Sequence, residues 1–300
     1  MHFIGIDIGG TSLRIGLVDA SFNVTAIERT SQSEALAGDA IESLCLLIED
    51  YIARHHLYGK VAGLSIALPG TISKDMSTVI NLPNVTGFNG QPLQAILQKR
   101  FPFPAYLIKD VSSLYSYDVQ RFNIKEEGVI IGCYLGTGIG NSISIDGKIL
   151  TGSNGASGEL GHIPLWGCAI SCNCGNEGCV ETMAGGLKLS QLQKEHFPQT
   201  EIGQLFTKHG DHPLLQEFVA ILAAAVATEV NILDPHTVIL GGGVISMEGF
   251  PMAFLEERIR FHARKPLPEA NLKFIHSDSA NENGIIGAAA YGWKQIKETK

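Results

Sequence analysis

Short apolar runs separated by glycine-rich turns open the chain, and this pattern predicts β-strands. The run 3–8 leads into the turn 9–11, and a second apolar run, 13–18, returns from it. A polar turn at 19–23 then leads to a third expected strand. Runs of this length that end at glycine or polar clusters favour strands over helices.

Apolar residues at helical spacing come next. Residues 37–56 carry them every three or four positions, which predicts a helix. An apolar strand is expected over 61–68, a helix over 91–101 and a short strand over 105–108. The region 183–260 reads as mostly helical around a buried strand at 237–240. A strand at 272–275 and a helix rich in glycine and alanine from Asn283 close the chain.

The opening pattern returns near the middle of the chain. Both copies read strand, glycine turn, strand and acidic turn. The coincident pairs are Ile4 with Ile131, Gly5 with Gly132, Gly9 with Gly136 and Asp19 with Asp146. A self-match at this long spacing implies two related domains rather than a solenoid, whose repeats are much shorter. The alternative is two unrelated glycine-rich hairpins.

Length and composition agree with a cytoplasmic protein of about two domains. The 300 residues are 45% apolar and 17% charged, which is typical of a well-cored globular chain. The net charge of −8, without a basic stripe, argues against a nucleic-acid partner. The first strand begins directly after Met1, so no signal peptide is expected. The longest apolar stretch, 218–227, is about half of a membrane span and predicts a core helix.

One loop combines three cysteines and a histidine at a spacing that predicts a structural zinc site. The four ligands are His162, Cys172, Cys174 and Cys179. A Cys₃His set closes a tetrahedral zinc site, so the metal would order the loop and perform no chemistry. Free or disulfide-bonded cysteines are the alternative, which a cytosolic location disfavours. Cys168 lies off the spacing and stays unassigned, while Cys45 and Cys133 sit in apolar runs typical of buried cysteines.

Three glycine clusters follow expected strands and are candidates for binding a nucleotide. Their residues are Asp7, Gly9, Gly10 and Thr11; Gly136, Thr137, Gly138 and Gly140; and Gly241, Gly242 and Gly243. Glycine turns let backbone N–H groups approach phosphate oxygens closely. Taken singly each cluster reads as an ordinary turn, and none is a Walker A or Rossmann motif. Their order along the chain favours two hairpins that grip a polyphosphate.

Carboxylates near these clusters are candidates for catalysis and sugar binding. Asp110 follows the short strand and Lys109, which suits a general base in phosphoryl transfer, although a surface aspartate is the plainer interpretation. Glu159 and Glu181 flank the zinc ligands and are expected to accept hydrogen bonds from sugar hydroxyls, or else to be solvated loop charges. Asn84 is a further candidate sugar contact or a turn residue.

With these residues assembled, the whole chain resembles the ROK family of sugar kinases. The two most specific motifs are Gly158-Glu159-Leu-Gly161-His162 and Cys172-x-Cys174-Gly-x-x-Gly178-Cys179-x-Glu181. The glycine clusters resemble the family's two phosphate motifs and its adenosine motif. The resemblance implies a duplicated α/β, actin-like ATPase fold of the hexokinase type, with a cleft between the domains. We expect one domain over 1–110, completed by the helix 284–300, and a second over 111–283.

The resemblance also implies ATP and Mg²⁺ as well as structural Zn²⁺, with Asp110 as the catalytic base. The sugar contacts that it implies are Asn84, Lys109, Asp110, Glu159, His162 and Glu181. Dimers are common in the family, so a homodimer is an allowed state, and a small sugar is the expected partner. The chain departs from the family at Lys109, where asparagine is common, and at Ser12, where lysine is frequent.

Within the family, the chain is most similar to members that phosphorylate allose. We therefore expect ATP-dependent phosphorylation of the 6-hydroxyl of an aldohexose, with D-allose preferred. Kinases of glucose or N-acetylmannosamine are the alternatives within the family. A non-catalytic, sugar-binding regulator is the alternative of another class. Because the first strand is predicted to begin at Phe3, we do not expect a DNA-reading module upstream of it.

Overall fold

The computed structural model describes residues 1–83 and 85–298, and the chain divides into two compact units. Unit 1 comprises 1–125, 151–157 and 280–300, and unit 2 comprises 126–150 and 158–279. Asn84, an expected sugar contact, lies outside the described residues.

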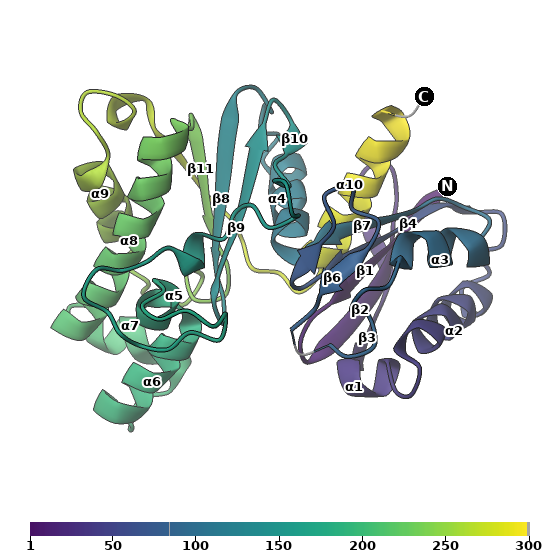
Figure 1. Cartoon of the computed structure of the whole chain (residues 1–300), viewed down its shortest axis with the longest axis horizontal. Helices are drawn as coiled ribbons and strands as arrows, with labels where there is room; N and C mark the ends of the chain where they lie inside the picture. Colours follow the sequence, from purple (N-terminus) through teal and green to yellow (C-terminus); the bar gives the residue numbers. More distant parts are fainter. Residues whose placement is uncertain (84, 299–300) are drawn as a thin grey trace. The chain divides into compact units, whose positions relative to one another are not determined.

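Unit 1 is built on a five-stranded sheet in the order β3-β2-β1-β4-β7 (Figure 1). Its strands are β1 (His2–Ile8), β2 (Ser12–Val18), β3 (Val24–Ser31), β4 (Val61–Leu68) and β7 (Ala105–Lys109). β1, β2 and β3 form an antiparallel meander, whereas β4 and β7 run parallel to β1. The carboxyl ends of the three parallel strands therefore meet at one edge of the sheet.

Helices cover both faces of this sheet. One face buries apolar side chains against α2 (Ala40–Arg54) and α3 (Leu93–Arg100). The other face carries α10 (Asn283–Glu298), where Trp293 packs on Phe3 with ring centroids 5.0 Å apart. α4 (Asp110–Arg121) lies along α10, and the Ser113 hydroxyl donates to the carbonyl of Gly284 at 2.7 Å. The smaller elements are α1 (Gln32–Ala35), β5 (Thr71–Ile72) and β6 (Val79–Asn81).

Unit 2 repeats this sheet, in the order β10-β9-β8-β11-β12. Its strands are β8 (Val129–Leu135), β9 (Ile139–Ile145), β10 (Lys148–Ile149), β11 (Thr237–Gly241) and β12 (Lys273–His276). β8, β9 and β10 are antiparallel, and β11 and β12 are parallel to β8. Because β8 and β9 take the positions that β1 and β2 hold in unit 1, the internal repeat and the duplicated α/β fold are confirmed.

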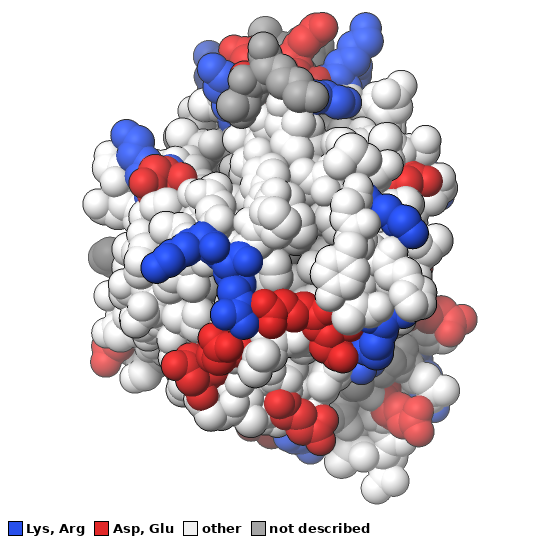
Figure 2. Space-filling view, turned by 90° about the vertical axis from the view of Figure 1, so that its right-hand side faces the viewer, with Lys and Arg blue, Asp and Glu red and all other residues white. Residues whose placement is uncertain are grey.

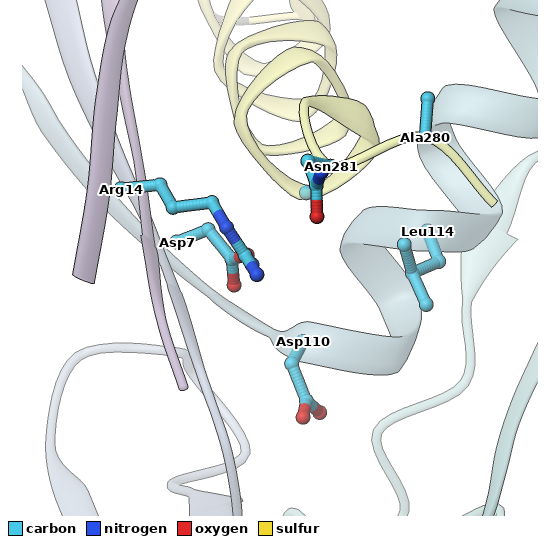
Figure 3. Close-up of a pocket in the computed structure, with 7 residues that line it drawn as sticks. Asp7, Arg14, Asp110, Leu114, Ala280 and Asn281 are labelled. Carbon is cyan, nitrogen blue, oxygen red and sulfur yellow. The ribbon is translucent and has the colours of Figure 1, made fainter. Parts of the chain in front are cut away.

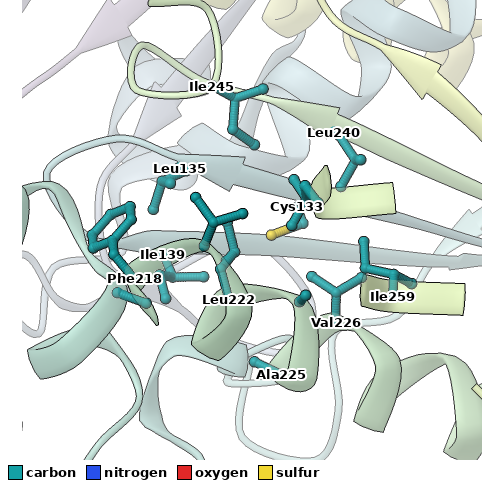
Figure 4. Close-up of a cluster of buried hydrophobic side chains, with 14 of the residues drawn as sticks. Cys133, Leu135, Ile139, Phe218, Leu222, Ala225, Val226, Leu240, Ile245 and Ile259 are labelled. Atoms are coloured by element: carbon teal, nitrogen blue, oxygen red, sulfur yellow. The ribbon is translucent and has the colours of Figure 1, made fainter. Parts of the chain in front are cut away.

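Helix α8 (Pro213–Leu233) forms the centre of the core of unit 2. Phe218, Leu222 and Val226 pack against side chains of β8 and β11 (Figure 4). By length and composition this one helix of the described chain would be able to cross a membrane, but more than half of it is buried inside the unit. The remaining helices are α5 (Glu181–Ala184), α6 (Gly186–His196), α7 (Leu205–His209) and α9 (Met252–His262), with single 3₁₀ turns at Leu160–His162, Ile202–Gln204 and Glu269–Asn271.

The observed elements follow the predicted ones closely, but the division of the chain differs, since unit 1 runs to residue 125 and also takes 151–157, which were expected in the second domain. The expected helix over 37–56 occupies 40–54, and the strands over 61–68 and 105–108 occupy 61–68 and 105–109. The first domain was expected to end at residue 110, whereas the first segment of unit 1 continues through α4 to residue 125. The reason is that α4 packs on α10, which belongs to the same unit.

Candidate active site and metal centre

A pocket of about 250 Å³ opens in unit 1 where the parallel strands end (Figure 3). Asp7 reaches it from the end of β1, Arg14 from β2 and Asp110 from the first turn of α4. The residues that complete its lining are Leu114, Ala280, Asn281 and Gly284. The structure thus brings together two predicted residues, the carboxylates of Asp7 and Asp110, and adds an arginine that the sequence reasoning missed.

Asp7 lies in this pocket beside a cation, with its side chain 14% exposed. It lies opposite Arg14 in the register of β1 and β2, and the Arg14 guanidinium donates from Nη1 to Asp7 Oδ2 at 2.9 Å. Burial raises the pKa of the Asp7 carboxyl above its ordinary value, while the charge of Arg14 acts in the opposite direction. A Cβ on Gly284 would lie 2.7 Å from the carboxyl carbon of Asp7, so glycine permits the start of α10 to approach this side chain.

Asp110 and Lys109 mark the change from β7 to α4. Lys109 ends the strand, and its ammonium donates to the carbonyl of Ser157 at 3.4 Å. Asp110 begins the helix, and its Oδ1 accepts the N–H of Val111 at 2.7 Å. The side chain of Asp110 is half-buried, so it combines a fixed backbone with access to the pocket. This placement suits a group that accepts a proton from a bound hydroxyl.

The first predicted phosphate cluster forms the turn between β1 and β2. The N–H of Gly9 donates to the carbonyl of Ser12 at 2.9 Å and closes the turn. A Cβ on Gly10 would meet nothing within 4 Å, so the backbone here is open to a ligand. The turn follows Ile8, the last residue of β1, and lies at the edge of the sheet where the strand ends.

In unit 2 the other two glycine clusters come together at the end of β8. Val244 donates its N–H to the carbonyl of Leu135 at 3.0 Å, immediately before Gly136. Gly242 has φ +96°, and a Cβ there would lie 2.5 Å from the same carbonyl, so glycine is required. Open space adjoins the backbone of Gly136 and Gly243. The glycine clusters at 136–140 and 241–243, which are far apart in the sequence, therefore lie together, and each has backbone next to open space.

The turn 136–138 is held in place from α6. The N–H groups that begin this helix, of Gly186 and Leu187, donate to the carbonyls of Gly136 and Thr137, each at 3.0 Å. Gly140, by contrast, belongs to β9 and pairs with Tyr134, so it is a strand residue rather than part of the turn.

The four predicted zinc ligands converge in unit 2. The ligand atoms of His162, Cys172, Cys174 and Cys179 all lie within 4.8 Å of one another. Cys174 and Cys179 have their sulfurs 3.6 Å apart, and Cys172 Sγ lies 3.6 Å from His162 Nδ1. A disulfide would need about 2.05 Å. Bonds of about 2.3 Å from zinc place tetrahedral sulfur ligands about 3.8 Å apart, so the cluster fits that metal.

The carboxylates beside the metal ligands have different surroundings. Glu159 Oε2 lies 3.9 Å from His162 Nε2, the ring nitrogen that faces away from the cysteines. Glu181 begins α5, and its Oε2 accepts the N–H of Ile139 at 2.8 Å. Glu181 therefore joins the cysteine loop to the second glycine turn, a contact that the sequence reasoning did not anticipate. Cys168 stands outside the cluster, with its sulfur 3.8 Å from the hydroxyl of Thr182.

The sequence reasoning also did not predict a buried carboxylate that bonds to β9, the strand after the turn 136–138. Glu229 of α8 is buried, and its Oε2 accepts from Asn141 Nδ2 at 2.9 Å. Burial raises the pKa of Glu229 to about 7, and the hydrogen bond from Asn141 only partly offsets this effect. The same amide nitrogen donates to the carbonyl of Gly132 at 3.2 Å. This pair fastens the core helix to the two strands that flank the turn.

The face of the molecule in Figure 2 carries basic side chains next to acidic ones. In unit 1, Arg54 pairs with Glu28 and Asp50, and Arg100 pairs with Glu49, each at 2.6 Å. Cations neutralised in this way do not form the continuous positive surface that binds phosphate backbones.

The duplicated sheet, with glycine turns after its first strands, defines the hexokinase-type branch of the actin-like ATPase fold. The chain belongs to the ROK family, whose model matches residues 3–295, which confirms the resemblance found in the sequence. It is 25% identical over 304 residues to an N-acetyl-D-glucosamine kinase of Vibrio cholerae, covering 96% of this chain and 98% of that protein.

Solved structures share the fold at lower identity. A ROK family glucokinase from Streptomyces griseus, in complex with glucose and AMPPNP, matches with a TM-score of 0.78 and 22% identity, covering 97% of this chain and 99% of that one. A ROK family transcriptional regulator, a homologue of the E. coli MLC protein, matches with a TM-score of 0.79 and 21% identity. That match covers 96% of this chain and 77% of the regulator.

Proposed function

We propose that this protein is an ATP-dependent sugar kinase that phosphorylates the 6-hydroxyl of an aldohexose. The observation that carries the proposal is the pocket of unit 1, where Asp110 and Asp7 meet at the carboxyl ends of parallel strands. Membership of the ROK family and the likeness to N-acetyl-D-glucosamine kinases support the same chemistry.

Asp110 is the proposed general base. Its carboxylate takes the proton of the 6-hydroxyl while the hydroxyl oxygen forms a bond to the γ-phosphorus and the bond to ADP breaks. Phosphoryl transfer asks little else of a protein beyond positioning and electrostatic stabilisation of the phosphates. A half-buried carboxylate fixed at the start of α4 meets the first requirement.

The glycine clusters are the proposed nucleotide contacts. The fit is supported by the open backbone at Gly10, Gly136 and Gly243, where a Cβ would meet nothing within 4 Å. Asp7 offers the carboxylate oxygen that Mg²⁺ prefers as a ligand. When bound, Mg²⁺ would neutralise phosphate charge during the transfer.

Zinc has a structural role in this proposal. The closed set of His162 and three cysteines leaves no ligand position for substrate. The metal would fix the loop on which Glu159 and Glu181 stand, so that these side chains and Nε2 of His162 bind sugar hydroxyls. Lys109 and Asn84 are the further proposed sugar contacts.

For the preferred sugar we propose D-allose, on the strength of the motif resemblance. N-acetyl-D-glucosamine is the second candidate, because the relatives at 25–26% identity are kinases of that sugar. The test is the kcat/KM for ATP-dependent phosphorylation across allose, glucose, mannose, N-acetylmannosamine and N-acetylglucosamine. If the kcat/KM for allose is lower than that for N-acetylglucosamine, allose is not the preferred sugar, but the proposal of a sugar kinase is unaffected.

A sugar-binding regulator without catalysis is the alternative, supported by the fold that the chain shares with a transcriptional regulator. It predicts sugar binding without sugar-dependent ADP release, so one coupled assay separates the two classes. The kinase proposal places the protein in the cytoplasm, with a small sugar and ATP as partners. The oligomeric states that we propose are a monomer and, as the alternative, a homodimer.

A further inference from the structure

A buried carboxyl and a buried amide meet in unit 2, where α8 contacts β9. Glu229 of α8 is 7% exposed and Asn141 of β9 is 2% exposed. Glu229 follows Ala225 and Val226 by one turn, on the face of the helix that packs against the sheet (Figure 4). In the described part of the chain it forms no ion pair, and its hydrogen-bond partner is Asn141 Nδ2, at 2.9 Å. Burial without a compensating charge favours the neutral acid.

The amide of Asn141 has one atom that needs a donor. Both of its N–H groups are used, since Nδ2 donates to Glu229 Oε2 at 2.9 Å and to the carbonyl of Gly132 at 3.2 Å. Its Oδ1, by contrast, is buried and has no hydrogen-bond donor among the described residues. A buried acceptor without a donor destabilises the folded protein, so this oxygen calls for a proton nearby.

A protonated Glu229 supplies that donor. A carboxylic acid accepts through one oxygen and donates through the other, and an amide accepts through its oxygen and donates through its nitrogen. Because Asn141 Nδ2 donates to Oε2, the acid proton is left to donate to Asn141 Oδ1 and to close an acid–amide pair of two hydrogen bonds. Burial raises the pKa of Glu229 to about 7, which agrees with a proton that is retained up to neutral pH.

Among the described residues, the elements that pack against α8 bring no cation into contact with Glu229. Their ionisable residues are Cys133 and Tyr134 of β8, Glu159 and His162 at the 3₁₀ turn 160–162, Glu181 of α5, and Glu256, Glu257, Arg258, Arg260 and His262 of α9. Within the described chain Glu229 forms no hydrogen bond or ion pair with any of them. Burial raises the pKa of the Cys133 thiol, which therefore stays neutral. A negative charge on Glu229 would be uncompensated.

Asn141 also lies against the loop that carries the proposed sugar contacts. Gly158 has φ +75°, and a Cβ there would lie 2.9 Å both from Asn141 Oδ1 and from its carbonyl oxygen. Glycine therefore lets the loop backbone approach this amide closely, one residue before Glu159. Three residues further along, a Cβ on Gly161 would lie 3.0 Å from the carbonyl of Ile139, so the same segment follows β9. The position of Asn141 thus determines where the loop begins.

We propose that Asn141 and Glu229 are positioning residues for sugar binding, and that their acid–amide pair holds the loop 158–162 and its Glu159 in place. This inference rests on the proposed kinase function and names two residues that it did not include. When Glu229 ionises, its bond to Asn141 Oδ1 is lost and a charge enters the core. The loop is then held less firmly, so the affinity for sugar falls as pH rises.

The affinity for ATP should respond much less. The turn 136–138 is held separately, by the N–H groups that begin α6 and by the bond from Ile139 to Glu181. The proposal therefore predicts a change in the KM for sugar with the KM for ATP nearly constant. Loss of folded protein, which a purely structural role would cause, lowers the apparent kcat and leaves the KM for sugar unchanged.

The test compares Glu229→Gln and Glu229→Leu with the wild type, and uses the exposed Glu217→Gln on the same helix as the matched control. Glutamine offers the same acceptor and a donor that does not titrate, so the pair persists at every pH. Leucine offers neither. The probes are D-allose and N-acetyl-D-glucosamine, with the KM of each measured from pH 6 to pH 8.

The wild type and the two variants should differ in their pH profiles. The KM of the wild type for sugar, divided by that of Glu229→Gln, should rise about tenfold from pH 6 to pH 8, because the protonated fraction falls about tenfold one unit above a pKa of about 7. Glu229→Leu should have a raised KM for sugar at every pH, and Glu217→Gln should follow the wild type. Identical profiles for the wild type and Glu229→Gln, or a lower kcat with an unchanged KM in Glu229→Leu, would overturn the inference.

Hydrogen exchange tests the same pair without turnover. Peptides that contain 158–162 should exchange faster in the wild type than in Glu229→Gln at pH 8, and equally at pH 6. Equal exchange at both pH values would overturn the inference, and this comparison also carries the test should Glu229→Leu not fold. Should the wild type release no ADP with any hexose, the proposed kinase function fails, and the exchange rates still decide whether the pair holds the loop.

Discussion

The buried carboxyl of Glu229 should make the stability of unit 2 depend on pH. Its pKa is raised from an ordinary 4.5 to about 7 by burial. Below pH 4.5 the group is protonated in the folded and unfolded states and imposes no penalty. Between 4.5 and 7 the unfolded chain releases the proton and the folded protein keeps it, so stability falls as pH rises. Above 7 the penalty is constant.

The size of this effect follows from the pKa difference. A pKa raised from 4.5 to about 7 corresponds to roughly 3 kcal/mol, at about 1.4 kcal/mol per pH unit. Glu229→Gln keeps an acceptor for Asn141 Nδ2 but does not titrate. The stability of the variant relative to the wild type should therefore rise by about 2–3 kcal/mol between pH 5 and pH 8.

The assay must report on unit 2. Urea unfolding from pH 5 to pH 8, followed by hydrogen exchange in peptides of α8 and β9, meets that need because opening is measured locally. Glu217→Gln is the matched control, since Glu217 lies on the same helix and is exposed. A stability difference for Glu229→Gln that stays flat with pH, or that changes in the opposite direction, would refute the reasoning.

Three further predictions concern the proposed chemistry. Asp110→Asn should lower kcat by about 10²–10⁴-fold while sugar binding persists in calorimetry, because the amide accepts no proton; near-normal turnover would remove Asp110 as the base. Cys174→Ser should lower both the zinc content and the melting temperature; wild-type protein purified without chelator that contains no zinc would contradict the metal assignment. Glu181→Ala should raise the KM for ATP about tenfold or more through loss of the bond to Ile139, with Glu181→Gln much closer to wild type; a change confined to the KM for sugar would make Glu181 a sugar contact alone.

Features that are determined by a short stretch of the sequence were predictable. The two glycine hairpins repeat along the chain because each encodes a strand, a turn and a strand within a short stretch, and both appear in the sheets as expected. The Cys₃His cluster was equally accessible, because its ligands share one loop. The Arg14–Asp7 pair was missed although a signal existed: a hairpin that turns at 9–11 places these two residues opposite each other.

Features that depend on distant segments were not predictable. Glu229 and Asn141 lie 88 positions apart, and neither stands in a recognisable motif. The hydrogen bond from Ile139 to Glu181 joins a turn and a loop that no spacing rule connects. The end of the first segment of unit 1 depends on how α4 packs along a helix from the other end of the chain. Tertiary packing, rather than local pattern, sets all three.

The assembly of unit 1 from three separate segments has a consequence for biosynthesis. Its sheet leaves the ribosome early, but α10, which covers one face of that sheet, is made only after unit 2. Until then Phe3 has no Trp293 to pack against and Asp7 lacks the start of α10 beside it. Unit 2 ends at residue 279 and is complete first. The nascent chain therefore carries one uncovered apolar face of this sheet until α10 is made, a stage at which chaperones commonly act.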